Sequence, residues 1–456
     1  YFGGSIDGLK MYNHSLSPQQ VLTLYNNRTD LIVPQETHWG ETWQSCVTPN
    51  DGKEDGVEVC SNNLTFVSGI ENVSVNSTWG TNFSVENLNA YYDFVDAFDR
   101  GFTNWKLEGD SITVLNMPFE GDGEQNATDY SGYGNGGTAT SAIWNSTGGY
   151  DGKGAYEFDG GDDIILITDD NTLDFTDKFT LMAWIKPDIL QDWDGIISKG
   201  YSSDNAYALL VSGTTTIKYC KGTTCLSCDA CGILTGKWQH VAITFNGGTV
   251  KYYINGTLIE TDTGGATPVS NGDQLQIGAD LYGGDEYFDG FIDGVMIFNR
   301  SLSAQQILAI YENNTDMVVS QEIDWGENWS ACVTPNSGTE NGVEVCSDNL
   351  TLSSGSENVT LTSSSGTNYT SENLTADYDF LSIFGSGFVN WKINGTYVVG
   401  LNMPFEEDGD QNATDYSGYK SDGTVTAAIW NSTGGYDGQG AYEFDGNGDY
   451  ITVSDS

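Results

Sequence analysis

The chain repeats itself with a period of 286 residues. Residues 1–170 align with residues 287–456 at this constant offset without a gap, and 104 of the 170 aligned pairs are identical, among them Trp105 and Trp391. A unit of this length is far longer than the repeats of solenoid proteins, so each unit should fold as domains of its own. Every prediction made for one unit therefore has a counterpart 286 residues away.

Alternating and apolar segments predict an all-β fold. Apolar side chains alternate through residues 179–186, and the run 241–245 is followed by Asn246-Gly247-Gly248 and a second run, 250–254. Runs joined by Asn-Gly turns are typical of antiparallel strands. Gly is abundant at 57 residues, Pro is sparse at 8, and only two short segments look helical.

Both helical segments begin after a serine. Ser17 is followed by Pro18 and then by Gln20. This spacing predicts Ser17 as the N-cap, proline at the first helical position and Gln20 closing a capping box. Ser303 and Gln306 repeat the pattern without the proline.

The charge of the chain argues against some classes of partner. Asp and Glu number 64 against 16 Lys and Arg, which gives a formal net charge of −48. Such a field repels nucleic acid and anionic membrane surfaces, and it favours divalent metals or cationic partners. A solvated surface that keeps the protein soluble explains the same charge. No run of 18 or more apolar residues occurs, so we predict no membrane span and expect targeting and anchoring segments outside this sequence.

Nineteen Asn-X-Ser/Thr sequons predict N-linked glycans on an extracellular, cell-surface protein. A chain rich in Asn, Ser and Thr produces several by chance, so low occupancy is the alternative. The acidic, sequon-rich pattern resembles surface proteins of archaea. The acceptor residues are Asn13, Asn27, Asn63, Asn72, Asn76, Asn82, Asn126, Asn145, Asn255, Asn299, Asn313, Asn328, Asn349, Asn358, Asn368, Asn373, Asn394, Asn412 and Asn431.

One module of about 200 residues is complete in this chain. Residues 115–316 contain, in order, FTLMAWIKP, GIISKG, YALLV, KWQHVAITFNGGTVKYYINGTLIE, LQIG and FDGFIDGVMIFNRSLSAQQI. This order resembles the laminin-G-like, concanavalin-like jelly roll. The repeat then makes residues 1–30 the C-terminal end of one such domain and residues 401–456 the N-terminal part of the next.

The segments between the jelly rolls resemble immunoglobulin-like or polycystic-kidney-like sandwiches. The strand pair that includes Trp105 is similar to the early strands of that fold, and hairpins that carry a cysteine pair are similar to its late strands. The resemblance predicts late strands at 31–66 and 317–353 and early strands at 67–114 and 354–400.

Two arrangements fit this order. The jelly roll is inserted into a loop of an immunoglobulin-like domain, which costs little when the ends of the guest lie close together. Alternatively, contiguous sandwiches alternate with jelly rolls. Trp105 should pack against the Cys332 and Cys346 hairpin in the first arrangement and against the Cys46 and Cys60 hairpin in the second.

Four cysteines predict two disulfides across hairpins. Cys46 and Cys60 lie fourteen residues apart on either side of a turn-rich segment, and Cys332 and Cys346 repeat the spacing. Disulfides are the expected state in a secreted chain, with free thiol pairs as the alternative.

The other four cysteines form one dense cluster, YCKGTTCLSCDACG. Two local disulfides at a hairpin tip are expected, and of the three pairings we favour Cys220 with Cys231 and Cys225 with Cys228. The C-x4-C-x2-C spacing also resembles the ligands of iron–sulfur proteins, and C-x2-C pairs bind zinc, so a metal site is the alternative.

Calcium is the expected cofactor besides the glycans, because laminin-G-like and pentraxin-like jelly rolls often bind this ion and hard oxygen ligands are plentiful. The candidate ligands are Asp122, Asp129, Asp159, Asp163 and Asp293. The alternative is that these aspartates cap their own turns.

No catalytic residue is predicted. Glu322-Ile323-Asp324-Trp325-Gly326-Glu327 resembles the E-x-D-x-x-E signature of laminarinase-like glycoside hydrolases, but it lies beyond the jelly roll, and the other copy has His38 in place of Asp324. No Ser, His and Asp form a recognisable triad. A glycoside hydrolase is therefore only a remote alternative.

Two classes of function remain. The first is a structural repeat segment of a long secreted surface filament or stalk, with neighbouring copies of the repeat as partners. The second is a multivalent adhesin that binds surface glycans or proteins through its laminin-G-like domains, because repetition raises avidity.

Overall fold

The computed structural model describes residues 3–6, 8–37, 41–66, 69–95, 98–121, 126–200, 206–213, 215–281, 286–338, 341–353, 356–366, 370, 373–380, 387–406, 412–436 and 438–454. The chain divides into two compact units, Tyr1–Ser353 and Ser354–Ser456. None of the helices in these described ranges is long and apolar enough to cross a bilayer.

The centre of the first unit is a jelly roll of two antiparallel sheets. The β15 sheet has the order β12-β13-β26-β15-β20-β21-β22, with β9 also paired to β26, and the β17 sheet has the order β10-β11-β14-β23-β16-β17-β18-β19. The strands of the β15 sheet are β9 (Thr113–Met117), β12 (Ile143–Asn145), β13 (Ala155–Asp159), β15 (Lys178–Ile189), β20 (Gln239–Asn246), β21 (Thr249–Ile254), β22 (Thr257–Thr263) and β26 (Asp289–Phe298). Those of the β17 sheet are β10 (Asn126–Ala127), β11 (Gly137–Thr140), β14 (Ile164–Ile167), β16 (Asp194–Lys199), β17 (Tyr207–Ser212), β18 (Thr216–Lys221), β19 (Thr224–Cys228) and β23 (Leu275–Ile277).

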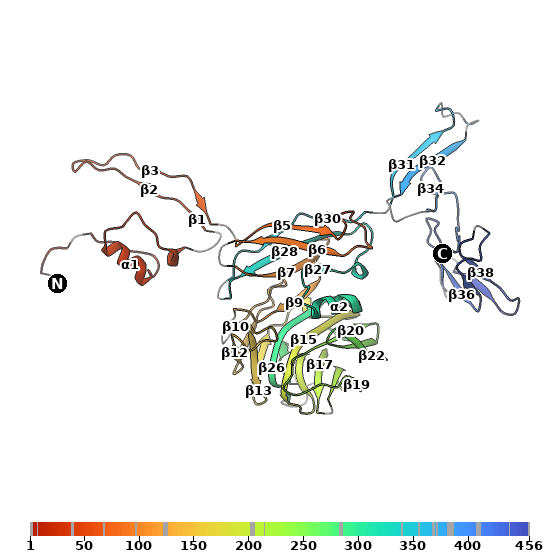
Figure 1. Ribbon diagram of the computed structural model, residues 1–456, viewed down its shortest axis with the longest axis horizontal. Coiled ribbons are helices and arrows are strands. Elements are labelled where there is room, and N and C mark those ends of the chain that lie inside the picture. The colour runs from red at the N-terminus through yellow and green to blue at the C-terminus, as the bar shows by residue number, and fades with distance from the viewer. Residues whose placement is uncertain are drawn as a thin grey trace. The chain divides into compact units, whose positions relative to one another are not determined.

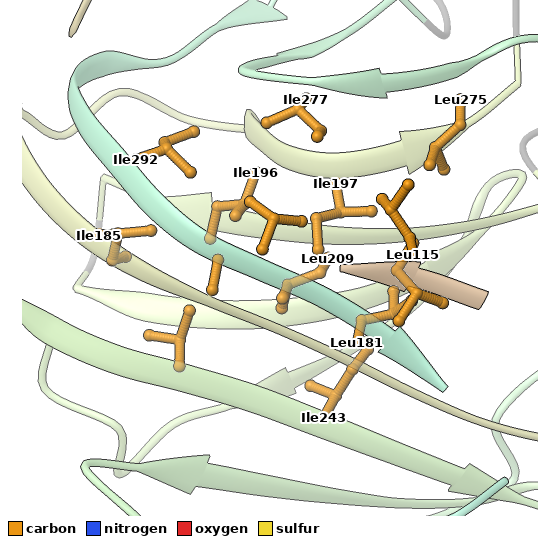
Figure 2. Close-up of a cluster of buried hydrophobic side chains, with 14 of the residues drawn as sticks. Leu115, Leu181, Ile185, Ile196, Ile197, Leu209, Ile243, Leu275, Ile277 and Ile292 are labelled. Atoms are coloured by element: carbon orange, nitrogen blue, oxygen red, sulfur yellow. The ribbon is translucent and has the colours of Figure 1, made fainter. Parts of the chain in front are cut away.

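Side chains from both sheets fill the space between them (Figure 2). Leu181 and Ile243 come from the β15 sheet, and Ile197, Leu209 and Ile277 come from the β17 sheet, and all five are fully buried. Burial of one such side chain contributes about 1.5–3 kcal/mol. The alternation read from the sequence is therefore the alternation between core and outer face.

The predicted Asn-Gly turn is present between β20 and β21. Gly247 and Gly248 both have positive φ, at 52° and 89°. A two-residue hairpin loop whose backbone twist matches that of the flanking strands needs this conformation at both positions. The expected hairpin is confirmed, with Asn246 paired to Thr249.

A second sandwich is built from residues on both sides of the jelly roll, and we call it the split sandwich. One sheet has the order β27-β6-β5, and the other has the order β29-β28-β7-β8 with β30 paired to β28. Its strands are β5 (Ile70–Ser77), β6 (Leu88–Phe94), β7 (Arg100–Leu107), β8 (Asp110–Ser111), β27 (Met317–Val318), β28 (Asn328–Asn336), β29 (Val345–Cys346) and β30 (Leu350–Thr351).

Strand β7 pairs with β28, which carries Cys332. Trp105 lies opposite Ala331, and its ring meets that of Trp329 edge to face at 6.3 Å. The Trp105 Nε1–H also donates to the carbonyl of Thr315 at 3.2 Å. Trp105 therefore packs against the strand that carries Cys332, as expected if the jelly roll is inserted into the sandwich. The immunoglobulin-like assignment of this sandwich stays a prediction.

Helix α2 (Ala304–Tyr311) packs between the two sandwiches (Figure 1). Its Ile307 is buried in one cluster with Met182 on the outer face of the β15 sheet and with Leu88 and Trp329 of the split sandwich. The outer face of the β15 sheet is therefore covered by α2 and the split sandwich. The outer face of the β17 sheet is the face of the jelly roll that these elements leave uncovered.

Both helices begin as predicted, but the capping box is wrong. Ser17 caps α1 (Pro18–Tyr25) and Ser303 caps α2, each accepting from the backbone N–H three residues on. The Ser17 N–H donates to Glu36 at 2.6 Å, and Gln20 instead bonds to Leu31 and Val33. Glu36, in the following 3₁₀ turn, thus accepts the Ser17 N–H that Gln20 was expected to accept.

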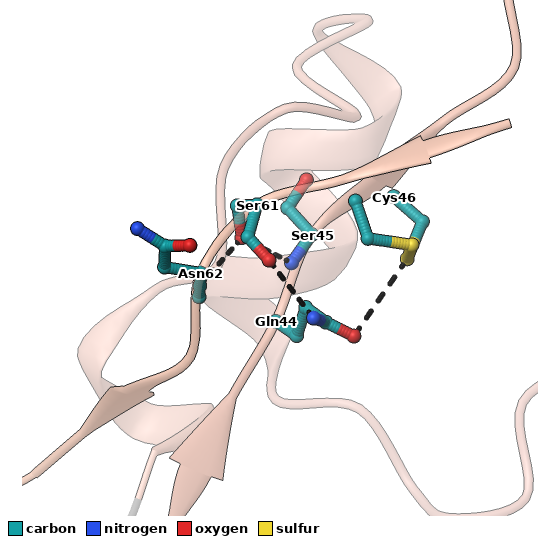
Figure 3. The surroundings of a disulfide bond; sticks show 6 residues. Gln44, Ser45, Cys46, Ser61 and Asn62 are labelled. Atoms are coloured by element: carbon teal, nitrogen blue, oxygen red, sulfur yellow. Dashed lines mark hydrogen bonds between the residues drawn. A yellow bond between two sulfur atoms is a disulfide. The ribbon is translucent and has the colours of Figure 1, made fainter.

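The N-terminal part, residues 3–66, contains α1, η1 (Pro34–Glu36) and the short strands β1 (Thr42–Trp43), β2 (Cys46–Val47), β3 (Val59–Cys60) and β4 (Leu64–Thr65). The described residues among 3–13 form no strand, although their counterparts form β26. Cys46 and Cys60 are opposite each other in the β2–β3 hairpin and form the predicted disulfide, beside which Ser45 N–H donates to Ser61 (Figure 3).

The second unit repeats parts of the first. Its strands are β31 (Ser356–Ser363), β32 (Leu374–Phe380), β33 (Lys392–Ile393), β34 (Thr396–Tyr397), β35 (Asn412–Ala413), β36 (Gly423–Thr426), β37 (Ile429–Asn431), β38 (Ala441–Glu443) and β39 (Tyr450–Val453). A small core forms around Ala413, Val425, Ala428 and Tyr442.

Candidate ligand-binding site

A hollow of about 290 Å³ lies on the outer face of the β17 sheet. Leu209 and Tyr219 point into the core of the jelly roll, so their neighbours Leu210 and Cys220 point outward and form the apolar floor of the hollow. The wall is completed by Trp193, Gly222, Thr223, Cys225, Asp280 and Glu286.

Trp193 supplies an aromatic surface at the edge of the hollow. It is 37% exposed, and its backbone has a φ of 75°, a conformation that bulky residues rarely adopt. The ammonium of Lys218 lies 3.6 Å from the ring centroid. This cation–π contact holds the indole in place while part of its surface stays in solvent.

Two carboxyl groups, those of Asp280 and Glu286, line the hollow beside its apolar floor. The pKa of Glu286 is raised to about 7 by burial and by the negative charges of Asp280 and Asp194, which Lys218 partly offsets. Burial also raises the pKa of Asp194 to about 6, although its carboxylate accepts the Gln191 N–H at 2.8 Å. Asp280 accepts from the hydroxyl of Ser198 at 3.0 Å. The hollow thus offers hydrogen-bond acceptors next to an aromatic ring.

The cysteine cluster forms two disulfides, but our pairing was wrong. Cys220 bonds to Cys225 and Cys228 bonds to Cys231. The register of the β18–β19 hairpin is the cause, because it places Cys220 directly opposite Cys225 with their Cα atoms 4.2 Å apart. The first of these disulfides lines the hollow, with Cys220 in its floor and Cys225 in its wall.

A second cavity, of about 300 Å³, lies between the split sandwich and the jelly roll. Arg100 of β7 forms an ion pair with Glu120 there. The pKa of Glu120 is raised to about 7 by burial and by the nearby Asp151, against the opposing effect of Arg100. Tyr150 stacks on Trp184 at 4.0 Å, so each of these two rings covers one face of the other.

His240 lines the same cavity. It is 1% exposed, and neither ring nitrogen has a hydrogen-bond partner among the described residues. Burial lowers the pKa of His240 to about 3. The imidazole is therefore neutral, and it contacts Trp184 edge to face at 5.4 Å.

The predicted calcium ligands do not converge on one place. Asp293 lines the cavity between the split sandwich and the jelly roll, where its carboxylate accepts the N–H groups of Tyr150 and Gly294. Asp129 accepts from the N–H groups of Asn116, Ser131 and Asn135. Asp122 lies outside the described residues.

Asp159 and Asp163 do lie together, and Asp162 joins them in a group in which one carboxylate oxygen from each residue lies within 4.8 Å of those from the other two. Within this group Asp163 accepts the N–H of Asp159 at 2.7 Å, and Asp159 accepts that of Gly161 at 2.8 Å. The group therefore caps its own turn, and calcium stays a prediction.

The glutamates of the E-x-D-x-x-E motif hold backbone groups. Glu322 accepts the N–H of Ser303 at the start of α2, at 2.6 Å. Glu327 accepts the N–H of Asp324 at 2.8 Å and the indole N–H of Trp329 at 2.9 Å. His38, in the other copy, lies outside the described residues.

Sequon asparagines whose side chains the structure describes are exposed or half-buried. Asn27, Asn255 and Asn313 have positive φ and occupy turns, whereas Asn72 has positive φ within strand β5. Asn368 lies outside the described residues. Glycan attachment stays a prediction.

Comparison with known proteins identifies the fold of the jelly roll. Residues 159–308 match the model of a family described as the Concanavalin A-like lectin/glucanases superfamily. The expected concanavalin-like jelly roll is confirmed. A search of curated proteins gave no significant match.

Several solved structures are similar. Domain 4 of AbnA, a GH43 extracellular arabinanase from Geobacillus stearothermophilus, in complex with arabinotriose, is 20% identical with a TM-score of 0.38, covering 46% of this chain and 99% of that one. The botulinum neurotoxin serotype G binding domain is 18% identical with a TM-score of 0.35, covering 44% and 51%. Trypanosoma rangeli sialidase is 14% identical with a TM-score of 0.35, covering 44% and 33%. The chain thus spans about half of the toxin domain and a third of the sialidase.

Sequence reasoning missed Trp193, Lys218 and Glu286. Trp193 immediately precedes β16 in the sequence QDWDG, and a tryptophan among polar residues is the signal that could have indicated a binding surface. The position of Lys218 over the Trp193 ring depends on the three-dimensional arrangement of two separate segments, so residue spacing alone could not predict it.

Proposed function

We propose that this chain is an extracellular glycan-binding protein, and that the hollow on the β17 sheet is the binding site. The observation that carries the proposal is the pairing of a partly exposed indole, Trp193, with carboxyl groups at the edge of one concave, apolar-floored surface. Sugar rings present C–H groups that pack on an aromatic face and hydroxyl groups that donate to carboxylates.

The charge around the hollow selects the kind of glycan. Asp194, Asp280 and Glu286 are acidic, and Lys218 is the cation that faces Trp193. Sialylated or sulfated glycans meet repulsion both here and from the net charge of −48. Neutral or amino-sugar oligosaccharides are therefore the proposed ligands.

Binding of the full chain to an array of neutral, amino and sialylated glycans tests the proposal. For the ligand found, Trp193→Ala should weaken the affinity measured by calorimetry at least tenfold, because buried aromatic contacts dominate binding energy. Trp79→Ala is the matched control, since Trp79 is 68% exposed on the split sandwich. No binding to any glycan, or equal loss in both variants, would contradict the proposal.

We propose no catalytic step for this chain. Glu322 and Glu327 are engaged with backbone and indole N–H groups near helix α2, outside both cavities. Hydrolysis of a β-glucan by the full chain that is lost on Glu322→Gln would overturn this.

A second candidate is the repeat segment of an extracellular filament or stalk. The observation that favours it is the split sandwich, which joins residues before and after the complete jelly roll and so offers a unit that a tandem array could repeat. Electron micrographs of the native surface should then show a periodic array, and evenly dispersed single molecules would contradict it.

A further inference from the structure

The cavity of about 300 Å³ between the split sandwich and the jelly roll, which we call the inter-sandwich cavity, has an exposed side and a buried wall. The exposed side includes Asp99, whose side chain is 72% exposed, and Phe94, which is 41% exposed. The buried wall includes His240 and Asp293, each 1% exposed. The volume lies at the lower end of the range for small-molecule sites, roughly 300–1,000 Å³. The cavity can therefore admit one small molecule from solvent.

His240 presents hydrogen-bonding atoms to this cavity that the protein does not satisfy. Val241 is buried in the jelly-roll core, so His240 lies on the outer face of the β15 sheet, opposite Trp184. The imidazole is neutral, so one ring nitrogen donates and the other accepts. Neither nitrogen has a hydrogen-bond partner among the described residues, and a buried polar atom without one costs about 1–3 kcal/mol. The imidazole therefore suits a ligand that both donates and accepts hydrogen bonds.

Most charged groups of the inter-sandwich cavity are engaged within the protein. Arg100 pairs with Glu120, and Lys153 pairs with Asp151 at 3.3 Å. Asp293 accepts two backbone N–H groups. Among the lining residues, each of which the structure describes, no three His, Asp or Glu side chains place their ligand atoms within 4.8 Å of one another. This arrangement does not favour a metal ion.

The balance of charge in the lining argues against an anionic ligand. Five carboxyl groups line the cavity, but Arg100 and Lys153 are its only cations. An acidic sugar would meet repulsion from these carboxylates and from the net charge of −48. Met296 and Ile310 add apolar surface beside the polar groups. An uncharged molecule that carries both hydroxyl groups and C–H surfaces matches this mixture.

We infer that the inter-sandwich cavity binds one uncharged polyol of monosaccharide size, as a free sugar or as the terminal residue of a glycan, whose hydroxyl groups hydrogen-bond to His240. This site is separate from the hollow on the β17 sheet, because the two lie on opposite faces of the jelly roll. Its walls belong to β7 of the split sandwich and to β20 of the jelly roll. The bound sugar therefore contacts both sandwiches.

Nitrogen NMR of the full chain, made with isotope-labelled histidine, tests this site, because the chain has three histidines. The probes are D-glucose, D-galactose, D-mannose and L-arabinose, with sialic acid as the acidic counterpart. A neutral sugar should shift the ring-nitrogen signals of His240 in a saturable way, and the exposed His14 should not respond. Sialic acid should give no shift at His240. No shift with any neutral sugar, or a shift with zinc chloride alone, would overturn the inference.

The same titration distinguishes the two sources of the sugar. An oligosaccharide that ends in the sugar found should bind more tightly than the monosaccharide if a glycan terminus is the ligand, and no more tightly if the free sugar is. The His240 signals report the inter-sandwich cavity and not the hollow beside Trp193. Failure of this inference is therefore distinguishable from failure of the proposed function.

His240→Phe tests the role of the imidazole while it keeps an aromatic ring in place. Its affinity for the sugar found, measured by calorimetry, should fall at least tenfold, because both hydrogen-bonding nitrogens are lost. His14→Phe is the matched control and should leave the affinity unchanged. Equal affinities of His240→Phe and the unaltered chain would overturn the inference. The NMR titration uses the unaltered chain, so it decides the question even if His240→Phe does not fold.

Discussion

His240 shows how one buried group sets the acid sensitivity of the fold. Its pKa is lowered to about 3 by burial, whereas a histidine in the unfolded chain titrates near 6.5. The unfolded state therefore binds a proton that the folded state does not, and stability falls as the pH drops below about 6.5 toward 3. His240→Phe should remove about 2 kcal/mol of the stability difference between pH 7 and pH 5.

Urea unfolding at the two pH values measures this effect. His14→Phe is the control, because His14 is exposed and paired with Glu36 at 3.3 Å. The same pH dependence in His240→Phe as in the unaltered chain would show that the imidazole is protonated in the folded state.

At the scale of elements, the sequence allowed us to predict strands and hairpins. It did not allow us to predict which side chains of neighbouring segments contact each other. The alternation in residues 179–186 identified β15, and the fourteen-residue cysteine spacing identified the β28–β29 hairpin. Neither the Cys220 and Cys225 pair nor the contact of Lys218 with Trp193 followed from spacing. The disulfide depends on the register of β18 with β19, and the contact depends on a loop conformation with positive φ at Trp193.

The paired disulfides allow a matched experiment on one element. Cys332 is buried in the split sandwich and forms with the exposed Cys346 a disulfide that closes a fourteen-residue loop, so replacing both with alanine should lower the unfolding free energy of the sandwich by about 3 kcal/mol. Replacing Cys46 and Cys60, which close the same loop in the exposed hairpin, should leave the main thermal transition of the body unchanged. Equal shifts in the melting temperature from both replacements would contradict this difference in packing.

At the scale of the whole molecule, the net charge of −48 opposes compactness. Raising NaCl from 10 to 300 mM shortens the screening length from about 30 Å to less than 10 Å, so the melting temperature should rise by several degrees. Calcium and magnesium chlorides at equal ionic strength form the control pair. A larger rise with calcium would support the predicted calcium site, and a melting temperature that falls with salt would contradict self-repulsion.

The insertion also dictates an order of events during synthesis. Strand β7 leaves the ribosome long before β28, because residues 108–327 are made between them. At about 5–20 residues per second, β7 waits roughly 10–45 s for its partner. The jelly roll can close in that interval, and its first and last strands, β9 and β26, are neighbours in one sheet. Folding of the guest thus brings the two halves of its host together, so the part that interrupts the domain is also the part that assembles it.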